Sequence, residues 1–225
     1  MVEFLETNPV LHMMMIESVR RGNADILADR PDGVMLLDRP SRTHMLAAAN
    51  PDAAREILDR VESFAMLTMH DEHTLDEARR RYQSKHFLDL VQAVYPKKAI
   101  DCIPGDIRRL DMSYFDFMRA HYDNIDDDGY IAERLSGGEV YGIFVDGALA
   151  GFMGTHQEGS LGMLEILPAY RRRGLAEALE RHVIDIHLSR GWMPFSQIKP
   201  DNPASLSLHK KLGFEISTEH MYWLY

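Results

Sequence analysis

The sequence has few of the features that mark secreted or membrane-spanning proteins. Its 225 residues include one cysteine, Cys102, so no intramolecular disulfide framework can form. No apolar run is long enough for a spanning helix, and no secretory signal sequence is evident. We therefore expect a cytoplasmic protein that has no membrane partner.

Basic charge is also in the minority. Lys and Arg number 25 against 35 Asp and Glu, a formal net charge of −10, so no global basic field favours nucleic acid. The G-x-G-x-x-G and G-x-x-x-x-G-K-[ST] patterns are missing, which argues against a Rossmann or P-loop site. The run His70-Asp71-Glu72-His73 has adjacent side chains that cannot all converge on one ion, and H-E-x-x-H spacing is absent, so we expect no metal.

Against this acidic background, three arginines stand together between an apolar strand and a helix. The strand Leu161–Leu167 leads through Pro168 to Arg171, Arg172 and Arg173, and Gly174 precedes a helix predicted to reach Ser189. The free N–H groups and the positive dipole end of that helix would face the loop, and a glycine there lets the backbone approach a phosphate. The order predicts a pocket for a diphosphate-bearing molecule.

A second motif follows at Asn202–Phe214. Asn202 is a good N-cap and Pro203 suits the first helical position, whereas Gly213 is suited to end the short helix.

The two segments together resemble the GNAT superfamily of acyl-CoA-dependent N-acyltransferases. Arg171-x-x-Gly174-x-Ala176 matches its pyrophosphate motif, and N-x-x-S-x-x-L-x-x-K-L-G-F matches its second signature; the resemblance covers Asp106 to Tyr225. It implies acetyl-CoA or coenzyme A as co-substrate, with the pantetheine arm beside the strand before the loop, where a backbone N–H would face the developing oxyanion. The residues implied to hold it are Ile166, Leu167, Arg171, Arg172, Arg173, Gly174, Leu175, Ala176, Asn202 and Ser205.

The general base departs from the pattern of glycine N-acyltransferase-like proteins. The glutamate that lies eleven residues before their motif arginine is replaced here by Ser160. Glu158 and His156 precede it at alternating positions, so all three would share one face of an extended strand. Glu158, His156 or a water held by Ser160 are alternative bases; the simpler interpretation makes Glu158 a solvent-facing loop residue.

The general acid departs as well. Where many members carry a tyrosine four residues before the glycine of the second motif, this chain has His209. An imidazolium, with an ordinary pKa of about 6.5, can protonate a thiolate whose conjugate thiol has a pKa of about 8.5. The alternative is that His209 only contacts the cofactor.

The pattern of apolar residues predicts alternating helices and strands, and the resemblance implies an α/β (α+β) fold in which helices flank a mixed, mostly antiparallel sheet. We expect a helix over residues 9–29, strands near residues 34–37, 44–48, 64–69 and 88–94, and a hairpin across Asp146-Gly147. Residues 1–100 are interpreted as an α/β domain, similar to a degenerate copy of the acyltransferase fold, and residues 101–225 as the acyltransferase domain.

The resemblance implies an N-acetyltransferase that acts on a primary amine of a small molecule or an amino-acid-like acceptor, by direct attack in a ternary complex. A longer acyl donor is an open alternative. Two rival functions are a catalytically inactive acyl-CoA-binding module and a regulatory domain whose arginine loop holds another phosphate. A monomer or a homodimer is expected.

Overall fold

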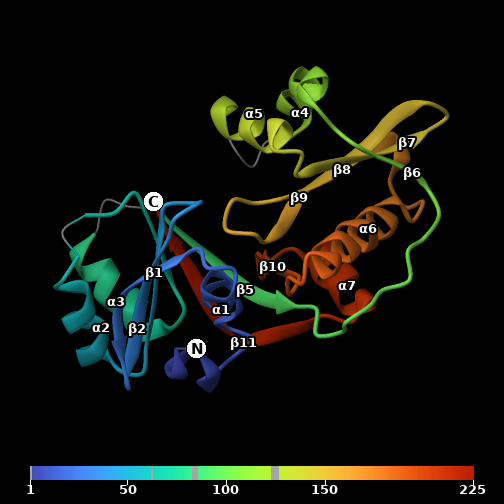
Figure 1. The fold of residues 1–225 in the computed structure, drawn as a ribbon. Coiled ribbons are helices and arrows are strands. Elements are labelled where there is room, and N and C mark those ends of the chain that lie inside the picture. Colours follow the sequence, from blue (N-terminus) through green and yellow to red (C-terminus); the bar gives the residue numbers. More distant parts are fainter. Residues whose placement is uncertain (1, 62, 83–85, 123–126) are drawn as a thin grey trace. The chain divides into compact units, whose positions relative to one another are not determined.

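The computed structural model describes residues 2–61, 63–82, 86–122 and 127–225 (Figure 1). Contacts divide the chain into two compact units. One consists of Met1–Tyr95 with Phe195–Tyr225, and the other of Pro96–Pro194. The last strands of the chain thus pack with its first half, so this grouping differs from the division at residue 100 that the motifs suggest.

The first unit is built on strands in the order β1-β2-β3-β4-β11-β5-β10. Neighbouring strands are antiparallel except for β3 and β4, which run parallel. The strands are β1 (Ala24–Arg30), β2 (Gly33–Asp38), β3 (Thr43–Ala48), β4 (Met66–Met69), β5 (Phe87–Val94), β10 (Phe195–Ile198) and β11 (Glu215–Leu224).

Helices cover this sheet on both faces. Figure 1 shows α2 and α3 on one face and α1 on the other. Residues from α2 and α3 form a core with the strands, in which Met35, Leu46, Ile57 and Leu67 are fully or almost fully buried. The helices of the unit are η1 (Glu3–Thr7, a 3-10 helix), α1 (Met13–Arg20), α2 (Pro51–Leu58), α3 (Glu72–Arg81) and α7 (Pro203–Leu212).

The helix predicted over residues 9–29 is wrong in its second half. Helix α1 ends at Arg20 and strand β1 begins at Ala24. Gly22, with a φ of 71°, reverses the chain, and the Asn23 N–H donates to the Ser18 carbonyl. This bond satisfies one of the last carbonyls of the helix and, with the turn at Gly22, ends the helix. The spacing of apolar residues alone does not indicate this end.

The second unit has strands in the order β6-β7-β8-β9, all antiparallel. Figure 1 shows α4 and α5 on one face of these strands and α6 on the other. The predicted turn at Asp146-Gly147 joins β7 and β8, both residues having positive φ. The elements are β6 (Asp106–Arg109), η2 (Met112–Tyr114), α4 (Phe115–His121), α5 (Asp128–Ser136), β7 (Val140–Val145), β8 (Ala148–Thr155), β9 (Leu161–Ile166), η3 (Pro168–Tyr170) and α6 (Leu175–Ser189).

The predicted fold class is confirmed: a mixed, largely antiparallel sheet is flanked by helices. Among the helices of the described residues, none is both long enough and apolar enough to cross a membrane.

Candidate functional site

The arginine loop joins β9 to α6 through η3, in the order that the sequence predicts. Arg172 and Gly174 both have positive φ values, 60° and 80°. Glycine adopts this conformation without strain, and a Cβ built at Gly174 would meet no atom within 4 Å. The backbone at Gly174 is therefore open on the side where a side chain would otherwise project.

Helix α6 begins at this glycine without a side-chain cap. Gly174 is the N-cap, and the Ala178 N–H makes a helical bond of 3.1 Å to the Gly174 carbonyl. The amides of Leu175 and Ala176 precede that bond, at the positive end of a 15-residue helix. By contrast, α2, α3, α5 and α7 each have an N-cap side chain that accepts a backbone N–H. The start of α6 is thus suited to bind an anion.

Arg171 is folded back onto the strand that precedes the loop. Its Nε donates to the Ile166 carbonyl at 2.8 Å, and its Nη2 lies 3.0 Å from Glu165 Oε1. The Leu167 N–H donates to the Ala150 carbonyl at 2.9 Å. The Ile166 carbonyl and the Leu167 N–H, both near the expected pantetheine arm, are therefore already hydrogen-bonded within the unit.

The other two arginines are exposed. The Arg173 guanidinium lies 5.7 Å from the centre of the Tyr170 ring, in a cation–π contact. The structure thus brings Arg172, Arg173, Gly174 and the first amides of α6 together at one loop.

Strand β9 contains a bulge just before this loop. Gly162 pairs with Gly154 and Glu165 with Phe152, so two residues of β9 lie opposite one residue of β8. Met163, in the bulge, has a φ of 56°, which is rare for a bulky residue. A bulge leaves a backbone group outside the ladder. Residue type gave no signal for it, because methionine does not favour positive φ.

The prediction that His156, Glu158 and Ser160 share one face of an extended strand is wrong. They lie in the tight turn between β8 and β9, closed by bonds of 2.9 Å from the His156 N–H to the Ser160 carbonyl and from the Gly159 N–H to the His156 carbonyl. Gly159, with a φ of 93°, permits the reversal. The Glu158 side chain turns inward and is 6% exposed, and the Ser160 hydroxyl donates to its Oε1. Glu158 is therefore not a solvent-facing loop residue.

Tyr130 joins this group from helix α5, a contact that sequence reasoning missed. Its hydroxyl donates to His156 Nδ1 at 2.5 Å. Burial raises the pKa of Tyr130, and the charge of Glu158 raises it further; burial lowers the pKa of His156. At neutral pH the pair is a neutral phenol bound to a neutral imidazole, beside the carboxyl group of Glu158.

The second motif belongs to the other unit and forms α7 as predicted. The Asn202 side chain accepts the Ser205 N–H at 3.1 Å, and Gly213, with a φ of 93°, ends the helix. Asn202 and Ser205 are thus brought together, and the cap uses the Asn202 oxygen. His209 lies one turn further on and is 5% exposed.

The environment of His209 favours the neutral ring. Its Nδ1 donates to the Ser205 carbonyl at 2.9 Å, which leaves the ring lone pair on Nε2. The ring packs edge-on against Phe214, 4.6 Å between centres. Burial lowers the pKa of His209 to about 4, so in the free protein the ring is a hydrogen-bond acceptor at neutral pH.

In the run His70–His73, His70 is buried, whereas Glu72 and His73 are exposed. His70 Nδ1 donates to the Leu11 carbonyl at 3.0 Å, and its Nε2 accepts from the Thr68 hydroxyl at 3.2 Å. Asp71 caps helix α3. Across the parts of the chain that the structure describes, no group of three or more His, Cys, Asp or Glu side chains is placed to hold a metal ion.

Known structures share this architecture. A Drosophila protein has a TM-score of 0.71 at 16% identity, over 98% of this chain and 92% of its own. A putative acetyltransferase of the GNAT family from Novosphingobium aromaticivorans has a TM-score of 0.55 at 19% identity, over 96% and 95%. A GCN5-related N-acetyltransferase-like protein from Streptococcus suis has a TM-score of 0.56 at 18% identity, over 97% and 96%. None of the curated proteins matches the chain by sequence.

The chain therefore has the GNAT fold, the acyl-CoA N-acyltransferase architecture. Residues 140–224 match the model of the FR47-like protein family, a GNAT-type domain that includes both motifs. The superfamily predicted from the motifs is confirmed for residues 140–224, the part of the chain that the family model matches.

Proposed function

We propose that the protein is an N-acetyltransferase. It transfers an acetyl group, or another acyl group, from acyl-CoA to a primary amine of a small molecule or an amino-acid-like acceptor. The observation that carries this proposal is the uncapped N-terminus of α6 behind three consecutive arginines. The GNAT fold supports acyl transfer as the class of reaction.

The loop would bind the diphosphate of coenzyme A. The amides of Leu175 and Ala176 would donate to its oxygens, and the exposed Arg172 and Arg173 would add charge-assisted bonds. Arg171 would exchange its bonds to Ile166 and Glu165 for a phosphate, or hold the strand in place for one. A backbone N–H in the Met163 bulge would face the thioester oxygen.

The reaction is a direct displacement within a ternary complex. The amine nitrogen attacks the thioester carbonyl carbon, the C–S bond breaks, and coenzyme A leaves as a thiolate. The amine loses one proton to a base, and the thiolate gains one. No covalent enzyme intermediate is required, and the exposed Cys102, whose pKa is raised by partial burial, is poorly suited to be a nucleophile.

Glu158 is our candidate for the base. It is an inward-facing carboxyl group, oriented by the Ser160 hydroxyl, beside the neutral Tyr130–His156 pair. A buried carboxylate held by a neighbouring donor is a suitable proton acceptor.

His209 would act on the leaving thiolate. A neutral imidazole with its lone pair on Nε2 accepts a hydrogen bond, and a thiolate brought near it would raise its pKa, because an opposite charge favours the protonated ring. Its low pKa in the free protein supports the alternative that His209 only contacts the cofactor.

The rival function is an acyl-CoA-binding or regulatory module without catalysis. Ser160 in place of a glutamate and the neutral His209 both favour it. Calorimetric titration with acetyl-CoA, coenzyme A and ADP is the first test, followed by turnover of acetyl-CoA with a panel of amines. Micromolar binding, about −8 kcal/mol, with ADP much weaker, supports the site. Binding without turnover of any amine favours the acyl-CoA-binding module. The absence of binding contradicts both the enzyme and that module, and favours a regulatory domain whose loop holds another phosphate.

We propose a cytoplasmic location from the single cysteine, and a monomer or a homodimer as the oligomeric state. Residues 1–100 would form the degenerate domain and residues 101–225 the acyltransferase domain, although the last strands pack with the first half of the chain.

A further inference from the structure

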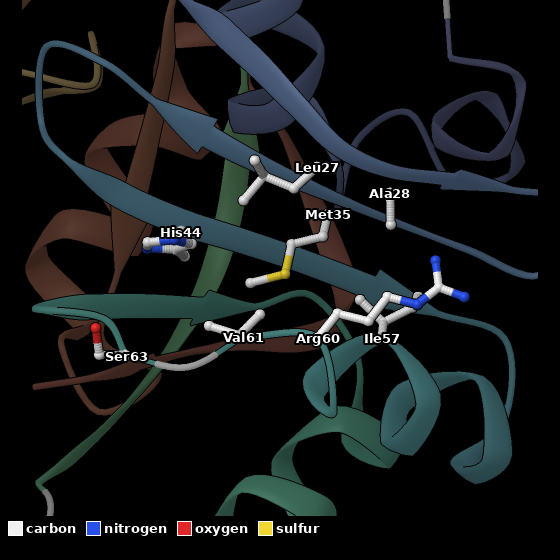
Figure 2. Close-up of a pocket in the computed structure, with 8 residues that line it drawn as sticks. All are labelled: Leu27, Ala28, Met35, His44, Ile57, Arg60, Val61 and Ser63. Atoms are coloured by element: carbon white, nitrogen blue, oxygen red, sulfur yellow. The ribbon is translucent and has the colours of Figure 1, made fainter.

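A cavity of about 290 Å³ lies in the first unit, outside both motifs. Figure 2 shows its lining, contributed by β1, β2, β3, the end of α2 and the segment that follows. Its volume is near the lower end of the range for small-molecule sites. The described lining residues are Leu27, Ala28, Met35, His44, Ile57, Arg60, Val61 and Ser63.

Most of this lining is apolar. Met35 and Ile57 belong to the buried core of the unit, with Val61 packed against it. Leu27 lies where the pairing of β1 with β2 is irregular, between Ile26 and Ala28, and its side chain is 47% exposed. An exposed leucine beside an opening into the core forms an apolar wall that a ligand would cover.

Arg60 is the one charged residue among the described lining residues. It is exposed, and within the described parts of the chain it makes no ion pair. Figure 2 shows its side chain running along the cavity toward Ala28, with Met35 between it and His44. A free guanidinium above an apolar wall presents a fork of donors that matches one carboxylate.

His44 adds a second polar group. It projects from β3, and its Nδ1 is buried without a hydrogen-bond partner within the described residues. Burial lowers the pKa of His44, so the ring is neutral at neutral pH. A buried ring nitrogen without a partner costs free energy that a ligand atom would recover. Ser63 supplies a hydroxyl on the same cavity.

We propose that this cavity binds a small amphipathic carboxylate. The carboxylate bonds to Arg60, the apolar body lies against the half-exposed Leu27 and the partly buried Val61, with Met35 and Ile57 beneath them, and His44 bonds to a polar atom of the ligand. The site is independent of the coenzyme A loop, because it shares no residue with it.

The test is a ¹H–¹⁵N NMR titration of the full chain with hexanoate, alongside hexan-1-ol and hexylammonium as probes of equal chain length. We expect saturable shifts at the cavity residues with hexanoate, and about tenfold weaker binding of the alcohol, which lacks the charge-assisted bond. The ammonium should bind more weakly still. Equal affinity for hexanoate and hexanol, or shifts confined to other residues, would overturn the proposal.

Two variants sharpen the test. Arg60→Gln should weaken hexanoate about tenfold and leave hexanol unchanged. Arg55→Gln removes the same charge from the exposed side of α2, outside the cavity, and should leave hexanoate binding unchanged. Both positions are exposed, so thermal unfolding should show both variants folded. If the two substitutions weaken hexanoate binding equally, non-specific charge attraction explains the binding, and a site at Arg60 is contradicted.

Discussion

The chain passes from strand to helix at β3–α2 and at β9–α6. The two crossovers differ in whether a side chain caps the first backbone N–H groups of the helix. In the first, Ala49 and Asn50 alone join the elements, and the Asn50 side chain accepts the Ala53 N–H at 2.9 Å. In the second, an eight-residue connection carries three arginines and ends at Gly174, which has no side chain to cap the helix. The first crossover satisfies its own amides, and the second leaves them for a ligand.

Asp71 occupies further backbone donors next to the crossover from β3 to α2. Its carboxylate accepts the Ala48 N–H at 2.8 Å and the Thr74 N–H at 2.6 Å, and so ties the end of β3 to the start of α3. An anion at this position would meet an acidic side chain that already uses the backbone donors. The N-terminal crossover is therefore unsuited to phosphate.

The two crossovers belong to stretches with the same order of elements. Residues 24–94 run β1-β2-β3-α2-β4-α3-β5, and residues 140–224 run β7-β8-β9-α6-β10-α7-β11. This shared order supports the interpretation of the N-terminal half as a degenerate copy. The difference between the two crossovers shows that the fold alone does not leave a helix N-terminus open; glycine in place of a capping residue does.

The largest effect is expected at the open helix. Gly174→Glu places bulk and negative charge among the amides of α6, and should weaken acetyl-CoA binding at least about 100-fold by calorimetry. Gly191→Glu is the matched control: Gly191 follows the other end of α6, has a φ of 74°, and a Cβ there also meets nothing within 4 Å. Both variants carry similar backbone strain. Full acetyl-CoA affinity in a folded Gly174→Glu protein would refute the site.

The next largest effect concerns turnover. His209→Ala should lower kcat at least about tenfold and change the acetyl-CoA affinity far less, if the ring acts on the leaving thiolate. Steady-state kinetics with a reactive amine, together with calorimetry, separates the two. Equal losses in turnover and binding would make His209 a cofactor contact, like the residues of the loop.

Local signals predicted the arginine loop and the second motif. The helix start at Gly174, the cap at Asn202 and the turn at Asp146-Gly147 each depend on neighbouring residues, and all form as expected. The Met163 bulge and the Tyr130–His156 bond depend on pairing between distant segments, which no single stretch of sequence encodes.

The order of the strands in the sheet could not be predicted either, because it also depends on pairing between distant segments. The last strand, β11, inserts between β4 and β5, and this insertion brings the C-terminal residues into the first unit. Apolar periodicity identifies strands but does not identify their partners. The inward turn of Glu158 likewise follows from the packing of the β8–β9 turn and not from its own residue type.

A smaller effect concerns the buried histidine of the N-terminal half. Burial lowers the pKa of His70 to about 3, below its unfolded value of about 6.5. The unfolded chain therefore binds more protons between these values, and stability falls as the pH drops through 6.5 toward 3. In His70→Gln this contribution disappears, so the free energy of unfolding should decline less between pH 7 and 4, by up to roughly 3 kcal/mol.

Urea unfolding at a series of pH values measures this slope. His73→Gln is the control, because His73 is exposed in the same segment and should leave the slope close to that of the unmodified protein. Acetyl-CoA binding at neutral pH should be unchanged in a folded His70→Gln protein, in contrast to the loop variants. An unaltered slope in His70→Gln would contradict the lowered pKa.

The smallest effect compares two N-caps, Asn50 of α2 and Asn202 of α7, whose side chains make equivalent bonds to Ala53 and Ser205. Each Asn→Ala change should cost about 1 kcal/mol of stability, and so lower Tm by about 2–4 °C. Because only the second cap belongs to a cofactor motif, Asn202→Ala should also weaken acetyl-CoA severalfold, whereas Asn50→Ala should not. Calorimetry measures the acetyl-CoA affinity of both variants, and thermal unfolding measures their Tm. Equal acetyl-CoA affinities would show that Asn202 only caps the helix.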